Sequence, residues 1–478
     1  MTSSPGRDSG EQVVVGVDFG SSRIKAAAYG RDGALVASTA LPTPLFSGPE
    51  GDDFLVGGML DAAQRAIAAL RWPNRSAVGV AMTSMGEVGT VLSAGALADL
   101  AFPSWYDSRG AEVVEDLERR WRPSELRERT GGHLRIASTV AKLGHLARSG
   151  VTVPEGTFLG ICGALAWQLT GEVWNEAGLA TTGGVYDIHD RSYLHQVWAA
   201  AGLARVVPPP VRHPGAWSPA TGDLAARLGI AEGAPVMIAG HDHPVAAVGA
   251  GITSDEVADS MGTGEAIIAV MQQAGPAEVR SRVADLLASD PYVSVEMWPP
   301  TGDLLVVWER MRPGLAMRAF LDRAEVTREE LDRLAPAPAV PLRMKDEMSL
   351  RLEAGRPLDV DYDAAMWGEL VDLYVLLAQR GEALVREVTG AQGVRVLTGG
   401  GLRSPRWRAG KAALATRPIE VSVVQETATR GCAAMVGTAC GWWTEPSLMP
   451  GAERIRVSPG STADMDRAGR RLSDAAAE

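Results

Sequence analysis

The sequence predicts an α/β fold with a duplicated architecture and a cleft between two lobes. Two observations indicate the duplication. Each half opens with an apolar strand, a turn of glycine and hydroxyl residues, and a second apolar strand. Each half then alternates strand and helix patterns, and the boundary between them is expected near 245–255. The opening segments are 13–18, 19–22 and 24–29 in the first half, and 255–260, 261–264 and 266–271 in the second.

The first half begins with three apolar runs of about six residues, the third at 35–39, which are separated by turns of Gly, Asp and Ser. This pattern predicts antiparallel strands. Beyond them, apolar residues at helical spacing predict helices, and short apolar runs that end in turn residues predict strands. The helices are 60–70, 110–121, 138–148 and 160–169, and the strands are 77–82 and 236–240.

The second half continues with a long helical pattern over 361–388 and a strand at 394–397 that runs into three glycines. A helix at 405–415, a strand at 419–424 and a helix of small residues at 430–442 follow. The polar, alanine-rich end is expected to be a frayed helix or a tail. The predicted organisation is a disordered tail at 1–12, domains at 13–249 and 250–457, and a tail at 458–478.

Composition limits the classes of function. The 478 residues are 46% hydrophobic and 22% charged, which is typical of a globular protein with a sizeable core. The net charge of −12 argues against a nucleic-acid surface and against anionic membranes, so neither is an expected partner. Phosphate ligands are not excluded, because backbone N–H groups and metal ions can hold them.

The N-terminus and the cysteines indicate a cytoplasmic protein. The first ten residues are polar, unlike a signal peptide. No run of about 18 apolar residues is present to span a membrane. Cys162, Cys432 and Cys440 are scattered in alanine-rich surroundings and are interpreted as small buried residues in a reducing compartment.

The turn after the first strand, Asp18-Phe-Gly-Ser-Ser-Arg-Ile-Lys25, is a candidate magnesium–phosphate site. A carboxylate at a strand end can hold Mg²⁺ directly or through water. Gly20 lets backbone N–H groups approach phosphate oxygens, and Ser21 and Ser22 add hydroxyl groups. Together with Lys25 these are the candidate phosphate-binding residues of the first half. An ordinary hairpin turn is the alternative.

Two glycine-rich segments of the second half are candidate nucleotide contacts. Gly262-Thr-Gly264 occupies the place equivalent to the first turn, so the pair predicts a two-sided phosphate clamp. Gly399-Gly-Gly-Leu-Arg-Ser404 lies between a strand and a helix, where glycines permit a nucleotide to approach a helix N-terminus. Its spacing differs from the dinucleotide-binding fingerprint. A plain strand–helix turn is the alternative.

The segment Gly240-His-Asp-His243 ends a buried strand, where Asp242 can act as a general base on a hydroxyl. Two histidines beside an acid are also potential metal ligands. However, His241 and His243 would point to opposite sides of an extended segment, and a metal site needs further ligands. The general base is therefore the favoured interpretation.

A further candidate is Trp105-Tyr-Asp-Ser-Arg109. In an extended stretch Trp105, Asp107 and Arg109 would share one face. A ring for the face of a sugar, a hydrogen-bond acceptor and a guanidinium donor would form a polyol site. A buried tryptophan beside a surface ion pair is the alternative.

Taken together and in order, these motifs resemble the FGGY carbohydrate kinases of the actin/hexokinase/Hsp70 superfamily. The resemblance runs from about Val13 to Trp443. The motifs are Asp18-Phe-Gly-Ser-Ser, Thr83-Ser-Met-Gly-Glu87, Trp105-Tyr-Asp-Ser-Arg109, Leu169-Thr-Gly171, Gly240-His-Asp-His243, Gly262-Thr-Gly264, and Gly399-Gly-Gly401 with Arg430-Gly-Cys-Ala-Ala434.

The resemblance implies two RNase H-like (actin-like ATPase) domains with an interdomain cleft, the sugar mainly on the N-terminal domain and MgATP mainly on the C-terminal one. It implies that Asp242 is the catalytic base and that Asp18, with Asp242, faces the magnesium ion. The implied nucleotide and phosphate residues of the second half are Gly262, Thr263, Gly264, Gly400, Gly401 and Ser404. The implied sugar-pocket residues are Ser84, Met85, Glu87, Trp105, Asp107 and Arg109, with His241 and His243 flanking the base.

The implied activity is ATP-dependent phosphorylation of a hydroxyl on a sugar, ketose or polyol, with ATP and Mg²⁺ as cofactors. Asp242 would accept the proton as the hydroxyl attacks the γ-phosphate in line, while Mg²⁺ and backbone donors offset the phosphoryl charge. A homodimer is expected by analogy with the family.

Several positions depart from the family pattern, and they bear on the substrate more than on the reaction. The region 300–340 matches poorly. An unusual acceptor, such as a cyclitol or an antibiotic-pathway sugar, is therefore an alternative. A sugar sensor or a phosphohydrolase on the same scaffold is another. The departures are Ser21 for Thr, Ser404 for Asn, Ala413 for Asp and Asn175 for Asp.

Overall fold

The computed structural model describes residues 12–70, 76–272, 276–335 and 342–477. The predicted N-terminal tail lies outside these residues, apart from Gln12, which begins the first strand. The chain forms two compact units. Unit 1 comprises Met1–Gly251, Glu296–Gly302 and Ala428–Gly451, and unit 2 comprises Ile252–Val295, Asp303–Thr427 and Ala452–Glu478. The predicted C-terminal domain, 250–457, includes Glu296–Gly302 and Ala428–Gly451. In the structure these two segments belong to unit 1.

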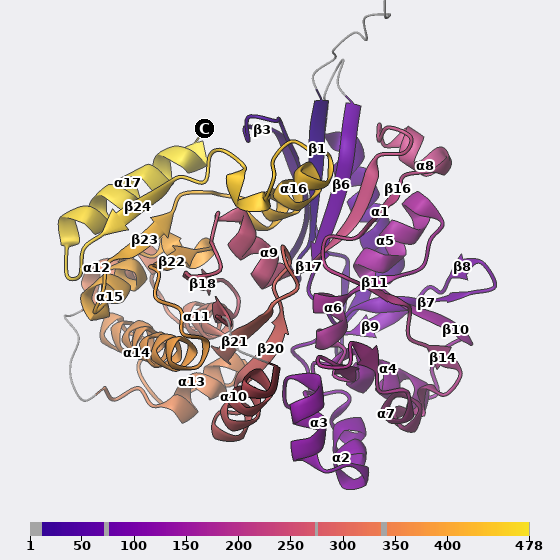
Figure 1. Ribbon diagram of the computed structural model, residues 1–478. Helices are drawn as coiled ribbons and strands as arrows, with labels where there is room; N and C mark the ends of the chain where they lie inside the picture. Colours follow the sequence, from indigo (N-terminus) through magenta and orange to yellow (C-terminus); the bar gives the residue numbers. More distant parts are fainter. Residues whose placement is uncertain (1–11, 71–75, 273–275, 336–341, 478) are drawn as a thin grey trace, which may run out of the picture. The chain divides into compact units, whose positions relative to one another are not determined.

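Unit 1 is built on a six-stranded sheet of order β16-β17-β6-β1-β2-β3 (Figure 1). The three predicted opening strands are confirmed as antiparallel neighbours. Next to them, β1, β6 and β17 run parallel, so their carboxyl ends meet at one edge of the sheet. The strands are β1 (Gln12–Phe19), β2 (Arg23–Tyr29), β3 (Leu35–Pro42), β6 (Ser76–Ser84), β16 (Trp217–Pro219) and β17 (Pro235–His241).

Unit 2 contains a seven-stranded sheet that repeats this pairing. The antiparallel strands β18, β19 and β21 correspond to β1, β2 and β3. Strands β22 and β23 follow β18 in parallel, and β24 closes the row antiparallel, as β16 does in unit 1. The predicted duplication is thus confirmed. In sheet order the strands are β20 (Val293–Met297), β21 (Leu304–Met311), β19 (Glu265–Val270), β18 (Val257–Met261), β22 (Arg395–Thr398), β23 (Ile419–Ser422) and β24 (Arg454–Val457).

Smaller sheets and the helices complete both units. The short strands are β4 (Leu45–Gly48), β5 (Gly51–Leu55), β9 (Ala101–Pro103), β7 (Gly89–Ser93), β8 (Ala96–Leu97), β10 (Gly156–Gly160), β14 (Val206–Val207), β11 (Asn175–Glu176), β15 (Val211–Arg212), β12 (Tyr186–Asp187) and β13 (Ser192–Tyr193). The helices before β18 are α1 (Val56–Ala69), α2 (Ala111–Arg120), α3 (Pro123–Thr130), α4 (Thr139–Arg148), α5 (Ile161–Thr170), α6 (Ala177–Thr182), α7 (His195–Trp198), α8 (Gly222–Arg227) and α9 (Asp242–Gly249). The later helices are α10 (Pro276–Ser289), α11 (Pro313–Leu321), α12 (Arg328–Leu334), α13 (Asp346–Glu353), α14 (Ala364–Thr389), α15 (Pro405–Leu414), α16 (Thr427–Ala439) and α17 (Thr462–Ala477).

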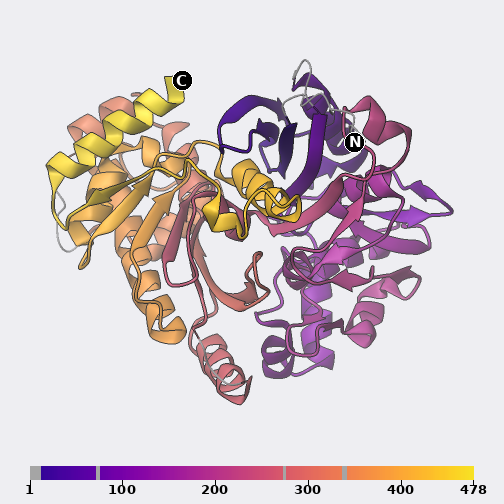
Figure 2. The same cartoon turned by 45° about the horizontal axis from the view of Figure 1, so that its top comes forward.

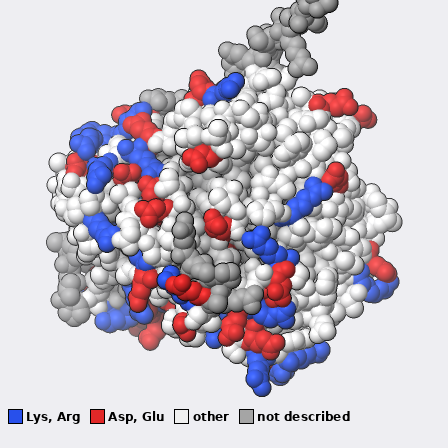
Figure 3. Space-filling model, viewed as in Figure 1, with Lys and Arg blue, Asp and Glu red and all other residues white. Residues whose placement is uncertain are grey.

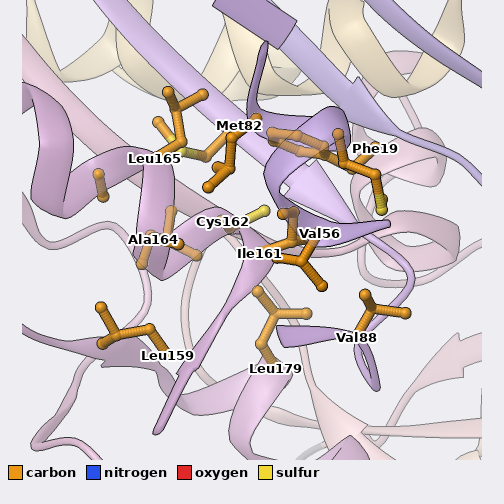
Figure 4. Close-up of a cluster of buried hydrophobic side chains, with 14 of the residues drawn as sticks. Phe19, Val56, Met82, Val88, Leu159, Ile161, Cys162, Ala164, Leu165 and Leu179 are labelled. Carbon is orange, nitrogen blue, oxygen red and sulfur yellow. The ribbon is translucent and has the colours of Figure 1, made fainter. Parts of the chain in front are cut away.

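The core of unit 1 lies between the six-stranded sheet and its helices (Figure 4). Helix α5 contributes fully buried apolar side chains such as Ile161 and Leu165, which pack near Phe19 and Met82 at the ends of β1 and β6. Each such burial contributes about 1.5–3 kcal/mol. The helix ends where the sequence predicts, because Gly171 adopts a left-handed φ of +75°. The core therefore fixes the strand ends that carry the candidate site.

The small-residue helix, α16, whose yellow ribbon Figure 2 shows from a second direction, packs closely on β1 and α9. Gly16 of β1 passes so near this helix that an added Cβ would lie 1.9 Å from the Thr429 carbonyl oxygen. Gly431 approaches α9 equally closely, with an added Cβ 1.9 Å from the Val245 carbonyl oxygen. Arg430 is buried and donates to the Gly249 carbonyl at the end of α9 at 2.5 Å. The motif around Arg430 thus ties α9 to its surroundings.

The C-terminal stretch is better ordered than the expected frayed helix or tail. Residues 462–477 form α17, in which Met465 and Ala468 are buried. These two apolar side chains are three residues apart, close to one helical turn, so they share the face that packs on the rest of unit 2. The polar average of the stretch conceals this narrow apolar face.

The exposed surface carries both signs of charge. On the face shown in Figure 3, acidic and basic side chains are interspersed, and neither forms a continuous patch. Among the described residues, no helix is both long enough and apolar enough to cross a membrane. Cys162 and Cys432 are buried, as their surroundings predict, whereas Cys440 is partly exposed.

Candidate functional site

The candidate site of unit 1 lies at the carboxyl ends of three parallel strands. Asp18 of β1 pairs with Thr83 of β6, and Thr83 in turn pairs with Gly240 of β17. The Thr83 hydroxyl donates to the Gly240 carbonyl at 2.7 Å, which locks β6 to β17 at this edge. In open α/β sheets, ligands bind outside such carboxyl ends. The sheet therefore brings Asp18 to the same edge as Asp242, with β6 between their strands.

Asp242 is the first residue of α9, immediately after β17. The strand is irregular at Gly240, whose φ of +130° lies in a region that favours glycine. Asp242 Oδ1 accepts a hydrogen bond from the backbone N–H of His243 at 2.7 Å. The side chain is 30% exposed, so an external group can reach it.

His241 connects Asp242 to a second carboxylate that the sequence analysis missed. Its Nε2 lies 3.2 Å from Asp242 Oδ1, and its Nδ1 lies 3.0 Å from Glu296 Oε2. Burial opposes a charge on this ring, but the negative charges of Glu296 and Asp242 raise the pKa of His241 well above its usual value. The ring is thus held in one orientation by carboxylates on both sides.

The two histidines do not point to opposite sides, contrary to the expectation from an extended segment. The His241 and His243 rings meet edge to face with centroids 5.9 Å apart. The reason is that the helix begins at Asp242, so only His241 belongs to the strand. Helical geometry then turns His243 away from the alternation of a strand.

Glu176 is a second acid that the sequence analysis missed. It precedes α6, and its two carboxylate oxygens accept from the backbone N–H groups of Gly178 at 2.8 Å and Leu179 at 2.9 Å. The side chain is almost fully buried. Burial, assisted by the charge of Glu296, raises the pKa of Glu176 to about 7 despite these hydrogen bonds. Oε2 would lie 3.5 Å from a Cβ added to Gly240, so Glu176 stands directly behind the strand end.

The raised pKa of Glu176 predicts a stability change with pH. The folded chain keeps a proton here up to about pH 7, whereas an unfolded glutamate with a pKa of 4.5 loses it earlier. Stability should therefore fall as pH rises from about 5 to 8, by about 3 kcal/mol from this group. In Glu176→Gln that part of the decline should disappear, as measured by urea unfolding at pH 5 and pH 8. The exposed Glu125→Gln serves as the control; an equal decline in Glu176→Gln and wild type contradicts the assignment.

The first glycine turn connects with the tryptophan motif. The indole N–H of Trp105 donates to Ser21 Oγ at 2.9 Å, and the same hydroxyl faces Met85 Sδ at 3.7 Å. Ser21 thus joins two predicted sugar-pocket residues to the predicted phosphate turn. Lys25 lies directly opposite Asp18 in the β1–β2 register, where opposite charges attract across the strands.

Asp107 and Arg109 form an ion cluster and not a pair of open groups. Arg109 Nη2 donates to Asp107 Oδ2 at 2.6 Å, and its Nη1 lies 2.7 Å from Asp53 Oδ1. The fully buried Lys142 donates to Asp107 Oδ1 at 3.1 Å. Burial would raise the pKa of Asp107, but the bond from Arg109 and the charge of Lys142 lower it overall. The alternative of a buried tryptophan beside a surface ion pair does not describe these contacts, because the ion cluster is largely buried and Trp105 is partly exposed. The predicted sugar contact remains a prediction.

A pocket opens beneath the end of β6. Ser84 lines it together with polar and aromatic side chains. The amide of Asn175, a position that departs from the family pattern, donates to the Tyr193 hydroxyl at 3.3 Å. Glu87 lies near enough for its charge to raise the pKa of His241. The main lining side chains are Ser84, Thr139, Phe158, Asn175, Tyr193 and Trp198.

In unit 2 the turn Gly262–Gly264 joins β18 to β19. It is closed by a bond from the Gly262 N–H to the Gly264 carbonyl at 2.9 Å. The Gly314 N–H in the first turn of α11 donates to the Thr263 carbonyl at 3.1 Å. An added Cβ on Gly314 would lie 2.7 Å from Thr263 Cα, so the turn rests directly on the helix backbone.

The second glycine segment of unit 2 follows β22. Gly399 has a φ of +93°, and an added Cβ would lie 2.5 Å from the Met261 carbonyl oxygen. Gly400 is exposed, whereas Gly401 is buried. The Ser404 hydroxyl caps α15 by accepting from the Trp407 N–H at 3.2 Å, and it donates to Asp332 Oδ2 at 2.9 Å. Ser404 thus has a structural role in the helix cap, and its predicted nucleotide contact is not tested by these bonds.

The donor set at the sheet edge of unit 1 suits magnesium. No group of three or more His, Cys, Asp or Glu side chains placed to hold a metal occurs among the described residues. Mg²⁺ needs only one or two protein carboxylates beside water and phosphate oxygens. Asp18 is buried, with only 8% of its surface exposed. Asp18 and Asp242 both lie near the Cys162 thiol. Burial raises the pKa of this thiol, and the negative charges of the two carboxylates raise it further.

Local signals for the missed residues do exist. Glu176 follows Asn175 at a strand end and precedes a run of small residues, as an N-cap does. Glu296 is a buried acid in β20, whose other buried residues, Val293, Val295 and Met297, are apolar. Lys142 is one of only four lysines in the chain, and two of the four, Lys142 and Lys411, are fully buried. Burial of this kind is rare for lysine without a partner.

Comparisons with known proteins agree with this architecture. The model of the N-terminal domain of the FGGY family of carbohydrate kinases matches residues 13–249. The L-fuculokinase of Salmonella typhi is 26% identical over 474 residues, covering 91% of this chain and 94% of that protein. The L-fuculokinase of Escherichia coli K12 is 27% identical over 268 residues, 54% of this chain and 56% of that protein. The crystal structure of xylulose kinase from Rhodospirillum rubrum superposes with a TM-score of 0.74 at 21% identity, covering 97% and 98% of the two chains. The fold is therefore the two-domain actin-like ATPase fold.

Proposed function

Because this chain belongs to the FGGY family of carbohydrate kinases, we propose that it transfers the γ-phosphate of ATP to a hydroxyl of a sugar or polyol with Asp242 as the general base. The chain is a carbohydrate kinase by family; the identity of the base and of the acceptor is the proposal. The observation that supports it most is the position of the Asp242 carboxylate, partly exposed at the carboxyl edge of three parallel strands.

In the proposed reaction Asp242 takes the proton of the acceptor hydroxyl. His241 holds Asp242 Oδ1 from one side, and Glu296 holds the far nitrogen of His241. This arrangement fixes the carboxylate, and positioning supplies much of the catalysis in phosphoryl transfer. Mg²⁺, held by Asp18 with Asp242, would offset the charge on the phosphoryl oxygens. The Gly262–Gly264 and Gly399–Gly401 segments are the proposed nucleotide contacts.

The acceptor is proposed from the relatives alone. The names of the aligned relatives make L-fuculose the first sugar to test. A cyclitol or an antibiotic-pathway sugar is the alternative within the same reaction.

The test is ADP release from MgATP with a panel of acceptors: L-fuculose and other ketoses, polyols including glycerol, and cyclitols. At least one acceptor is expected to stimulate ADP formation well above the rate with ATP alone. A phosphohydrolase would release ADP equally fast without an acceptor, and a sugar sensor would release none. Either result contradicts the proposal.

A further inference from the structure

Unit 2 contains a buried charge network that none of the predicted motifs includes. Lys411 of α15, Asp259 of β18 and Glu265 of β19 are all fully buried. The Lys411 ammonium donates to Asp259 Oδ2 at 3.0 Å and to Glu265 Oε1. Arg395 of β22 lies 2.5 Å from the same Asp259 oxygen and 2.8 Å from Glu382 of α14. Five ionisable side chains from five elements thus meet in the interior.

Such a network is hard to explain by stability. Each buried ion loses several kcal/mol of hydration, and well-packed apolar residues often stabilise a core as much. Burial and the charge of Asp259 raise the pKa of Glu265 to about 8, although Lys411 opposes this. Burial and the nearby Asp259 charge therefore favour the protonated form of Glu265. Asp259 Oδ1 and Glu265 Oε2 have no other partner among the described residues, so this proton can lie between the two carboxyl groups.

The position of the network indicates its role. Glu265 directly follows the Gly262–Gly264 turn and pairs with Met261, the last residue of β18 before that turn. Lys411 therefore holds both strands that carry the turn. Its own helix, α15, begins just after the Gly399–Gly401 segment, whose backbone packs against Met261. One ammonium group thus joins the two glycine segments through their supporting elements.

We propose that Lys411 is a positioning residue for the nucleotide phosphates, which fixes the Gly262–Gly264 turn relative to the Gly399–Gly401 segment through its bonds to Asp259 and Glu265. This inference rests on the proposed role of both segments as nucleotide contacts. Backbone N–H donors stabilise a phosphoryl group best when they are already held in place, because their reorganisation during the reaction raises the barrier. Lys411 is therefore expected to affect the binding of ATP and not the binding of the acceptor.

The test uses two variants that remove the contact between Lys411 and Glu265 and two controls. One control keeps that contact, and the other changes an exposed lysine elsewhere in the chain. Lys411→Met removes the ammonium, and Glu265→Leu removes its acceptor; both should raise the dissociation constant and the KM for ATP by about tenfold or more. Glu265→Gln should stay near wild type, because its amide resembles the protonated acid, accepting from Lys411 and donating to Asp259. The exposed Lys345→Met is the matched lysine control and should change neither constant.

The KM for the acceptor should change less than about twofold in all four variants, since the acceptor segments lie in unit 1. Thermal unfolding establishes which variants fold; if Lys411→Met does not, Glu265→Leu carries the comparison with Glu265→Gln. Unchanged ATP affinity, measured by calorimetry, in folded Lys411→Met or Glu265→Leu overturns this inference. A wild-type chain that binds ATP but phosphorylates no acceptor overturns the proposed function instead. A chain that binds no ATP overturns both.

Discussion

Asp242→Asn is expected to lower kcat by about a thousandfold while acceptor binding persists. The amide keeps the size of the carboxylate and can still occupy the first turn of α9. It cannot accept a proton at neutral pH, and general-base catalysis contributes about 10²–10⁴-fold. The measurement is steady-state ADP release together with calorimetric titration of the acceptor. Wild-type turnover in Asp242→Asn would remove Asp242 from the role of base.

Glu296→Gln provides a matched comparison for this variant. It removes the charge behind His241 and keeps the shape of the side chain, so it acts on Asp242 only through the imidazole. We expect kcat to fall by about tenfold with little change in the KM for the acceptor, because the base remains but is less firmly oriented. An acceptor KM that rises while kcat stays constant would instead indicate that Glu296 contacts the sugar.

Gly431→Ala is expected to destabilise the chain by about 3 kcal/mol or more. The new Cβ would lie 1.9 Å from the Val245 carbonyl oxygen, and a backbone atom cannot rotate away as a side chain can. Overpacking of this kind forces the elements apart. Here those elements are α16 and α9, and α9 begins with Asp242. Urea unfolding measures the stability, and ADP release from the folded fraction measures the effect on the base.

Gly160→Ala is the control for the glycine substitution. Its nearest neighbour is the Val88 carbonyl oxygen, 3.9 Å from an added Cβ, so the methyl group has room. Replacing glycine by alanine at this N-cap position should cost about 1 kcal/mol, because alanine caps a helix less well. Gly16→Ala, which meets the Thr429 carbonyl at 1.9 Å, should resemble Gly431→Ala. Equal stability of Gly431→Ala and Gly160→Ala would contradict the close approach of α16.

The predicted elements agree with the structure where their patterns are local. The antiparallel strands β1, β2 and β3 follow from apolar runs separated by short turns, and α5 ends within one residue of the predicted end at 169. The histidines flanking Asp242 show the limit of such reasoning. The two rings contact each other because α9 begins at Asp242, between the two histidines. The direction of the His243 side chain therefore depends on the residue at which the strand ends and the helix begins.

The sequence by itself determined the duplicated strand–turn–strand pattern and the placement of Asp18 and Asp242 at strand ends. These features depend on residues within a few positions of one another. Only the tertiary structure decided which charges are buried and paired. His241 meets Glu296 across 55 positions, and Lys411 meets Glu265 across 146. The energy of a charged group depends on its neighbours in space and on its exposure to water, and long-range packing sets both.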